Sequence, residues 1–253
     1  MLQVKNLSLF RNKKLLYQNL SFTMNAGECW GVLGKNGVGK STLLLAIANL
    51  YNEYDGEILF DSNNLQTIKK REFAQLIGLM LQKDDNIFPI KVLDYVKQGR
   101  YAYQSNQIFD KEIDTNKAIL ALEWAGVTHL ANRNITQLSG GEMRRVAFAT
   151  ILVQSPKLYL LDEPVSQVDI KYQHHILNHV QTVVKQENKA ALIVLHDVNL
   201  VEKYCDRVIF LFENGECHVG EKKQLMSEAL LERLYDYPIE RLEIDSKIVY
   251  LPK

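Results

Sequence analysis

A glycine-rich loop near the N-terminus constrains this chain more than any other feature. Residues 34–42 read Gly-Lys-Asn-Gly-Val-Gly-Lys-Ser-Thr and fit the pattern G-x-x-x-x-G-K-[ST]. The apolar run Trp30–Leu33 precedes the loop, and an apolar helical pattern begins at Ser41. Glycines let the backbone curl so that its N–H groups point at phosphate oxygens, and the following helix adds the positive end of its dipole. A strand, this loop and a helix in that order predict a phosphate-binding loop.

Two side chains at the end of the loop suit a nucleoside triphosphate. Lys40 can reach the β- and γ-phosphates, and the Ser41 hydroxyl can coordinate Mg²⁺. The other positions that would surround the phosphates are Gly34, Asn36, Gly37, Gly39 and Thr42. A turn without a ligand is the alternative, but a Lys-Ser pair has no purpose in a turn. We therefore expect the chain to bind a nucleoside triphosphate with Mg²⁺.

Polar residues follow two later apolar runs. The first run, Leu158–Leu161, ends in Asp162 and Glu163. Ligands lie at the carboxyl ends of parallel strands, so Asp162 is suited to help hold Mg²⁺ and Glu163 to polarise an attacking water. The second run, Ala190–Leu195, ends in His196. By themselves these residues would be an exposed acidic strand end and a capping histidine, but the phosphate-binding loop upstream favours a hydrolytic site.

Apolar periodicity predicts an α/β fold. We expect strands at residues 2–10, 20–24, 30–33, 56–60, 157–161, 190–195 and 207–212. We expect helices at residues 41–50, 92–96, 118–125, 142–153, 172–186 and 200–204, and a tail from about residue 227 with a helix and short strands. Alternating strands and helices predict a parallel sheet covered by helices, and the helical middle of the chain is interpreted as an insertion.

Charge and hydropathy exclude several classes of protein. The chain has 253 residues with 30 basic and 30 acidic side chains, and this balance argues against a domain that binds nucleic acid. No apolar run approaches the ~18 residues that span a bilayer, and no secretory signal is present. Three scattered cysteines favour a reducing compartment. We expect a cytoplasmic protein, which does not exclude docking on a membrane partner.

One more loop completes a recognisable set of motifs. Leu138-Ser-Gly-Gly-Glu142 precedes a helical run, and in isolation it would be an ordinary helix N-cap. Together with the phosphate-binding loop, the acidic strand end and His196, in this order, it makes the chain resemble the ATP-binding subunits of ABC transporters. The resemblance covers nearly the whole chain. It implies a P-loop NTPase (RecA-like) core with an antiparallel β subdomain and an inserted α-helical subdomain.

The resemblance also implies domain boundaries and roles for single residues. Residues 1–253 would form one ATP-binding cassette, with a helical subdomain at about 88–152 and a C-terminal extension at about 227–253. Gln82 corresponds to the Q-loop, Asp169 to the end of the D-loop, and His196 to the switch histidine, with Glu163 as the catalytic glutamate. Phe10 stands where the family places an aromatic ring against adenine, with Tyr17 as a substitute. The implied sets are Glu163, His196 and Gln82 for catalysis and Ser41, Gln82 and Asp162 for Mg²⁺. Ser139, Gly140 and Gly141 would contact the γ-phosphate of ATP held by the opposite subunit.

Partners follow from the same resemblance. Two copies would pair head to tail around two ATP molecules and drive integral membrane permease subunits, with a substrate-binding protein in the full system. The chain would lie on the cytoplasmic side of the membrane. Residues 96–100, 130–133 and 195–200 are most similar to importers of iron-siderophore complexes, haem and vitamin B12. The alternatives are a soluble ABC-type ATPase, an exporter ATPase and a nucleotide-binding regulator; the regulator would lack Glu163 or His196.

A few positions depart from the family pattern or stand outside it. Arg144 replaces a usual Gln, and the D-loop reads Ser-Gln-Val-Asp at residues 166–169 where Ser-Ala-Leu-Asp is common. Residues 100–103 read Arg-Tyr-Ala-Tyr where Arg-x-Pro is frequent. His174, His175 and His179 have a spacing that can bind zinc, but a solvated helix face is favoured because no third ligand is apparent. Residues 69–71 are interpreted as a solvent-facing basic cluster, and Cys205 as a packing residue.

Overall fold

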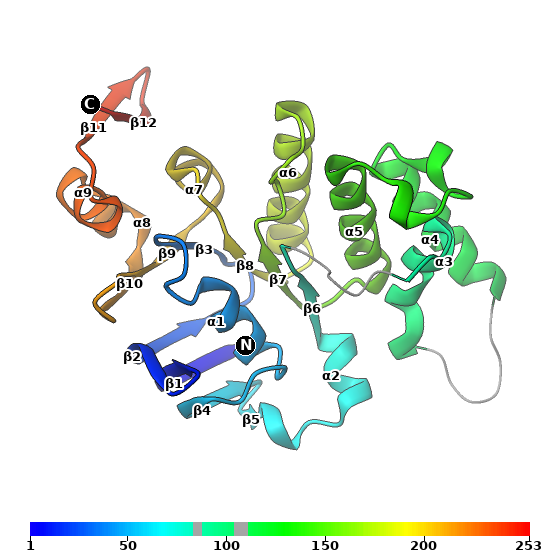
Figure 1. The fold of residues 1–253 in the computed structure, drawn as a ribbon, viewed down its shortest axis with the longest axis horizontal. Helices are drawn as coiled ribbons and strands as arrows, with labels where there is room; N and C mark the ends of the chain where they lie inside the picture. Colours follow the sequence, from blue (N-terminus) through cyan, green and yellow to red (C-terminus); the bar gives the residue numbers. More distant parts are fainter. Residues whose placement is uncertain (83–87, 104–110) are drawn as a thin grey trace.

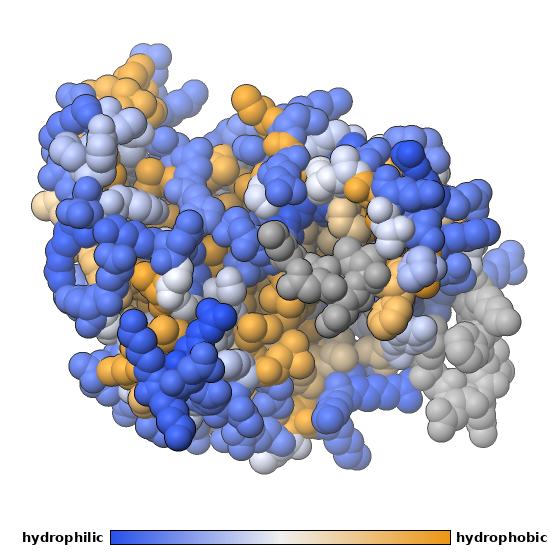
Figure 2. Space-filling view, viewed as in Figure 1, coloured by the Kyte–Doolittle hydropathy of each residue, from blue (hydrophilic) through white to orange (hydrophobic). Residues whose placement is uncertain are grey.

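The computed structural model describes residues 1–82, 88–103 and 111–253 (Figure 1). In this part of the chain the strands form a six-stranded sheet, a four-stranded sheet and a two-stranded hairpin. None of the helices there is long and apolar enough to cross a membrane. Figure 2 shows that hydrophilic residues cover most of one face of the molecule, while hydrophobic residues gather near its middle.

The six-stranded sheet places the predicted site. Its order is β10-β9-β3-β8-β7-β6, and all neighbouring pairs are parallel except β9 and β10. The strands are β3 (Cys29–Leu33), β6 (Ile77–Met80), β7 (Leu158–Asp162), β8 (Ala190–Val194), β9 (Arg207–Leu211) and β10 (Cys217–Glu221). Every residue of β3, β7 and β8 is buried, as expected for continuous apolar strands that are covered on both faces.

The second sheet is antiparallel and packs across helix α1. Its order is β2-β1-β4-β5, formed by β2 (Lys14–Met24), β1 (Leu2–Arg11), β4 (Tyr54–Phe60) and β5 (Asn63–Asn64). Helix α1 (Lys40–Ile47) shares one hydrophobic cluster with this sheet and with one face of the six-stranded sheet. The helix that follows the phosphate-binding loop is therefore held by apolar contacts on two sides, which fixes the direction of its N-terminus.

The middle of the chain forms a helical region with a core of its own. It contains α3 (Val92–Lys97), α4 (Lys111–Trp124) and α5 (Gly140–Gln154), with short 3-10 turns at Gln98–Tyr103, Thr128–Leu130 and Ile135–Gln137. Its buried cluster includes Val92, Leu122 and Val146. Figure 1 places this region beside the sheets, opposite the C-terminal elements. Residues 104–110 of the predicted helical subdomain lie outside the described residues.

Helices and a hairpin cover the other face of the six-stranded sheet. They are α6 (Ile170–Gln186), α7 (Val198–Tyr204), α8 (Lys222–Leu225), α9 (Glu228–Tyr235) and the hairpin of β11 (Ile239–Ile244) and β12 (Lys247–Pro252). The hairpin is anchored to α7, because the Asn199 amide donates to the Tyr250 carbonyl at 3.1 Å and accepts from the Tyr250 N–H at 2.8 Å. The predicted helix and short strands of the tail are thus confirmed.

Several boundaries differ from the sequence prediction. Strand β2 starts at Lys14, six residues before the predicted strand, because Asn19 has a φ of 57° and the register shifts along β1 break the alternation there. Helix α1 ends at Ile47, before a left-handed Asn49 with a φ of 55°. Strands β6 and β10 and helix α2 (Lys70–Leu76) were not predicted.

Candidate functional site

The carboxyl ends of four parallel strands meet around one cavity. The loop after β3 is the phosphate-binding loop, and Gln82, Glu163 and His196 follow β6, β7 and β8. The cavity has a volume of about 270 Å³. It is lined by Arg11, Asn36, Gly37, Gly39, Lys40, Ser41, Thr42, Gln82, Glu163 and His196. Residues predicted from four separate segments thus share one space, which we call the nucleotide cavity.

The curl of the phosphate-binding loop depends on glycine at two positions. Gly39 has a φ of 102°, and a Cβ atom there would lie 2.9 Å from Leu16 Cδ1. A Cβ atom on Gly34 would lie 2.5 Å from the Leu211 carbonyl oxygen. Left-handed geometry and close packing both require glycine. Gly39 is also the N-cap of α1 and offers no side-chain cap, so the first N–H groups of the helix stay open to an anion.

Lys40 is a buried cation held by the loop itself. Its ammonium group donates to the carbonyl oxygens of Gly34 at 2.7 Å and Lys35 at 2.8 Å, and the residue is 6% exposed. Burial lowers the pKa of Lys40, and the charges of Glu163 and Asp162 act in the opposite direction. The positive charge is therefore positioned before any phosphate arrives, and a phosphate could replace the two carbonyl partners.

Asp162 is the buried carboxylate next to this cation. It is 2% exposed, and among the described residues its Oδ1 atom has no hydrogen-bond partner. Burial raises the pKa of Asp162 and nearby Glu163 adds to the rise, whereas hydrogen bonds with Ser41 and the Gln82 backbone and the charge of Arg144 oppose it. A buried carboxylate oxygen without a partner, beside a serine hydroxyl, is a ligand set that fits Mg²⁺.

Glu163 is held between two side chains from neighbouring strands. Gln82 Nε2 donates to one carboxylate oxygen at 2.7 Å, and His196 Nε2 lies 2.6 Å from the other. The Glu163 side chain is 13% exposed, while that of His196 is 46% exposed. Glu163 also has a φ of 49°, an uncommon conformation for a residue other than glycine, asparagine or aspartate. The backbone thus turns sharply after β7 and directs the carboxylate into the cavity.

Arg144 connects this site to the helical region. The residue is 7% exposed, and its guanidinium donates to Ser166 Oγ at 3.1 Å and to the Leu81 carbonyl at 2.6 Å. Ser166 Oγ in turn donates to the Glu163 carbonyl at 3.0 Å. Burial lowers the pKa of Arg144, and the charges of Glu163 and Asp162 oppose that shift. In the sequence Arg144 stands out only as a departure from the family pattern, and this link has no local signal because its contacts come from distant segments.

The loop at Leu138–Glu142, the signature loop, does not line the nucleotide cavity. Ser139 caps α5 in a capping box: its Oγ accepts from the Glu142 N–H at 3.3 Å, and Glu142 Oε2 accepts from the Ser139 N–H at 2.8 Å. Glycine is needed here for close packing, since a Cβ atom on Gly141 would lie 2.7 Å from the Gln167 carbonyl oxygen. Asp169 is also absent from the cavity and caps α6, accepting from the Tyr172 N–H at 3.0 Å.

The two aromatic candidates for the adenine lie outside the cavity lining. Phe10 is half-buried near the end of β1, and its carbonyl accepts a hydrogen bond from the Tyr51 hydroxyl at 2.6 Å. Its neighbour Arg11 lines the cavity, and sequence reasoning did not predict this. Tyr17 is fully buried beneath Gly39, so its ring is not available to stack on a base.

Three further predictions concern residues outside the nucleotide cavity, namely the histidines at 174–179, the basic cluster at 69–71 and Cys205. The interpretation of a solvated histidine face is wrong for His179, which is half-buried and lies 4.6 Å from the Trp124 ring. Among the described residues, no group of three or more His, Cys, Asp and Glu side chains is arranged to hold a metal ion. In the basic cluster, Arg71 Nε donates to the Ala102 carbonyl at 3.0 Å, so that residue is not simply a solvated charge. Cys205 is buried next to Cys29, and a hydrogen bond with Cys29 together with burial raises its pKa, as suits a packing role.

Comparison with known sequences identifies relatives across most of the chain. A family model described as ABC transporter matches residues 17–166. The hemin import ATP-binding protein HmuV of Pseudomonas fluorescens is 37% identical over 240 residues, covering 93% of this chain and 92% of the relative. HmuV of Bordetella avium is 33% identical over 241 residues, covering 92% and 91%. The ferric enterobactin transport ATP-binding protein FepC of Escherichia coli is 31% identical, covering 92% and 86%.

Solved structures match the fold over similar lengths. A chain of a structure described as an inward-facing metal-chelate type ABC transporter superposes with a TM-score of 0.83 at 28% identity, covering 100% of this chain and 97% of that chain. An ATP-binding cassette solved as a dimer with ADP and phosphate gives a TM-score of 0.77 at 25% identity, covering 87% and 98%. The predicted α/β fold with a P-loop core is therefore confirmed.

Proposed function

This chain belongs to the ABC transporter family, and from that membership we propose that it is the ATPase subunit that powers import of an iron chelate or haem. The chain binds nucleotide and is an ATPase of the ABC class. The observation that carries the proposal is the Glu163 carboxylate, held by Gln82 at 2.7 Å and His196 at 2.6 Å in the cavity that contains Lys40. This arrangement suits hydrolysis better than binding alone, because a base and its orienting groups face the phosphate-binding loop.

In the proposed reaction, water attacks the γ-phosphorus of ATP. Glu163 accepts a proton from the water, a P–O bond forms, and the bond between the γ-phosphorus and the β–γ bridging oxygen breaks to release ADP. Lys40 and the open N-terminus of α1 stabilise charge on the phosphate oxygens. Ser41, Gln82 and Asp162 would hold Mg²⁺, which when bound neutralises charge on the β- and γ-phosphates. His196 keeps the Glu163 carboxylate in place.

The remaining roles require a second copy of the chain. Ser139, Gly140 and Gly141 lie outside the nucleotide cavity of their own chain, which is consistent with their use by a neighbour. We propose a head-to-tail dimer in which this loop contacts the γ-phosphate of the opposite ATP and Asp169 lies at the junction. Phe10 remains the proposed adenine contact. Residues 1–253 would form one cassette, with residues 88–152 as the inserted helical subdomain and 227–253 as a C-terminal extension.

The transported solute is proposed from the relatives. Three of them are named for hemin or ferric enterobactin, and the matched transporter structure is described as a metal-chelate type. We propose that the chain docks at the cytoplasmic face of the membrane on permease subunits and works with a substrate-binding protein. Uptake of labelled haem, iron chelates and cobalamin in cells lacking the protein tests this step. Undiminished uptake of all of them would exclude it.

The hydrolytic assignment is tested with Glu163→Gln. The amide cannot accept the proton of the attacking water, so the turnover rate should fall about 10³-fold. ATP affinity should remain within about twofold, since no phosphate contact is removed. Turnover would be measured by phosphate release and affinity by titration calorimetry. A variant that hydrolyses ATP at the normal rate would show that Glu163 is not the base.

A further inference from the structure

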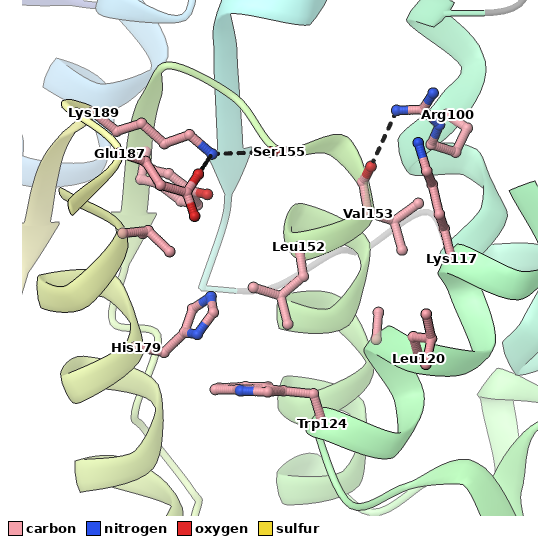
Figure 3. Close-up of a pocket in the computed structure, with 13 residues that line it drawn as sticks. Arg100, Lys117, Leu120, Trp124, Leu152, Val153, Ser155, His179, Glu187 and Lys189 are labelled. Carbon is pink, nitrogen blue, oxygen red and sulfur yellow. Dashed lines mark hydrogen bonds and ion pairs between the residues drawn. The ribbon is translucent and has the colours of Figure 1, made fainter.

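A second cavity lies between the sheet core and the helical region, away from the nucleotide cavity (Figure 3). It has a volume of about 410 Å³, within the range of small-molecule sites. Its walls come from α4 and α5 on one side and from α6 and the start of β7 on the other. It has no lining residue in common with the nucleotide cavity. We call it the seam cavity, because Trp124 and Leu152 in its wall pack against the hydrophobic clusters of both parts.

The floor of the seam cavity is apolar and aromatic. His175 stacks on the Trp124 ring with centroids 4.0 Å apart and an interplanar angle of 18°. Figure 3 shows His179 and Leu152 directed over the Trp124 ring, with Leu120 beside them. Leu120 is 63% exposed at the edge of the cavity, so its side chain is open to contact with a ligand. These groups form a surface that an aromatic or aliphatic body would cover.

Two polar groups in the wall lack a hydrogen bond or an ion pair within the described part of the chain. In the described ranges, with gaps at 83–87 and 104–110, the His179 ring forms no hydrogen bond and Lys117 forms no ion pair. Burial lowers the pKa of His179 and so favours the neutral ring, which carries one N–H donor. By contrast, Lys189 is paired with Glu187 at 2.8 Å.

The charge of the wall favours an anion. The three cations Arg100, Lys117 and Lys189 line the cavity, against the single carboxylate of Glu187. Arg100 is already bound to Asp114 at 3.0 Å, which leaves the Lys117 ammonium as the available contact for a negative group. A ligand that satisfies the wall therefore needs an apolar body of limited size and one acidic group.

We propose that the seam cavity binds a small organic anion with an aromatic body, such as an aryl sulfonate or aryl carboxylate. The body covers Trp124, Leu120 and Leu152 and packs against His179, and the acidic group pairs with Lys117 on the α4 side of the cavity (Figure 3). Because the ligand contacts α4 and α6 together, it resists any movement of the helical region relative to the core. Arg144 of α5 supports the Glu163 segment through Ser166 and the Leu81 carbonyl, so a ligand that restrains this region slows ATP turnover without occupying the nucleotide cavity.

The test uses the full chain and the fluorescent aryl sulfonate 8-anilinonaphthalene-1-sulfonate. We expect one saturable site with a Kd on the order of 10 µM, measured by fluorescence and calorimetry. Leu120→Asp places a negative charge, of the same sign as the sulfonate, on the apolar wall and should weaken binding at least tenfold. Leu50→Asp is the matched control, since Leu50 is 67% exposed and does not line the cavity. Equal affinity in wild type and Leu120→Asp, or an equal loss in Leu50→Asp, overturns the proposal.

Two further measurements test the charge preference of the seam cavity and its separation from the nucleotide cavity. Lys117→Ala should weaken binding of the sulfonate about fivefold while changing binding of the neutral analogue N-phenyl-1-naphthylamine by less than twofold. An equal loss for both probes overturns the anionic part of the proposal. Saturating ATP with Mg²⁺ should leave the sulfonate bound, and displacement would place it in the nucleotide cavity. The sulfonate should slow turnover at least twofold in wild type and not in Leu120→Asp, and an unchanged wild-type rate overturns the coupling.

Discussion

Two glycine-rich loops of this chain each precede a helix, but only one leaves its helix N-terminus open. Before α1, Gly39 provides no side-chain cap and the first turn has no acidic residue, so N–H groups and the Lys40 ammonium face a cavity. Before α5, Ser139 and Glu142 satisfy each other in a capping box. The first N-terminus is neutralised only when an anion arrives, whereas the second is already neutralised by its own glutamate.

The comparison shows that a glycine-serine pattern does not by itself define an anion site. In the phosphate-binding loop, glycine is required by left-handed backbone at Gly39 and by close packing at Gly34. In the signature loop, Gly141 is required by contact with the Gln167 carbonyl. The first loop lines a cavity within its own chain, whereas the second packs on the Gln167 carbonyl and leaves Ser139 exposed at the surface.

The largest expected difference between the two loops is in nucleotide affinity. Lys40→Ala removes charge-assisted hydrogen bonds to two phosphates, which corresponds to about 3 kcal/mol or ~100-fold weaker ATP binding. Titration of the isolated chain with a fluorescent ATP analogue would measure it. Unchanged affinity would mean that the loop does not bind the β- and γ-phosphates.

The next largest effect is expected from Arg144, which links helix α5 to the nucleotide cavity. Arg144→Met leaves the Leu81 carbonyl and Ser166 Oγ without their donor, so Glu163 loses support and turnover should fall about 30-fold. ATP affinity should stay within about twofold, because Arg144 does not line the nucleotide cavity. Arg144→Gln keeps one donor and should give an intermediate loss. If binding and turnover fall together, Arg144 supports the whole fold rather than Glu163.

Removing the cap of α5 should affect stability and turnover modestly. Ser139→Ala loses the N-cap hydrogen bond, which costs about 1 kcal/mol and lowers Tm by about 3 °C. Because Ser139 would also lose one hydrogen bond to the opposite γ-phosphate, turnover should fall about tenfold. Affinity of the isolated chain for ATP should not change. Calorimetry and phosphate release measure these effects, and weaker ATP binding by the isolated chain would contradict the proposed use by a neighbour.

The smallest expected effect is a pH dependence of the stability that the Ser139–Glu142 capping box of α5 contributes. Hydrogen bonds from the Ser139 N–H and hydroxyl lower the pKa of Glu142 below its ordinary value. A carboxylate with a lowered pKa stabilises the fold above its unfolded pKa, which is about 4.3, and this contribution is lost as the pH falls through the folded pKa. Wild type should therefore exceed Glu142→Gln in unfolding free energy at pH 7, with the difference shrinking below about pH 4. A constant difference across this range would assign the effect to packing.

Local motifs were predictable because the residues that act together are adjacent in the chain. The phosphate-binding loop, the strand ending in Asp162 and Glu163, and the strand before His196 were all correctly placed within one or two residues. The helical middle and the tail were also predicted by type. Strand β6 was missed because it is only four residues long, which is too few positions to reveal a period.

The sequence by itself determined that a loop able to hold phosphates stands between a buried strand and a helix, because glycine geometry and a lysine-serine pair act locally. Only the tertiary structure decided which distant groups serve that loop. Gln82 and His196 reach Glu163 across separations of 81 and 33 residues, and Arg144 joins three segments. These contacts arise because parallel strands bring their carboxyl ends to one edge of the sheet, and the packing that aligns them has no local signal.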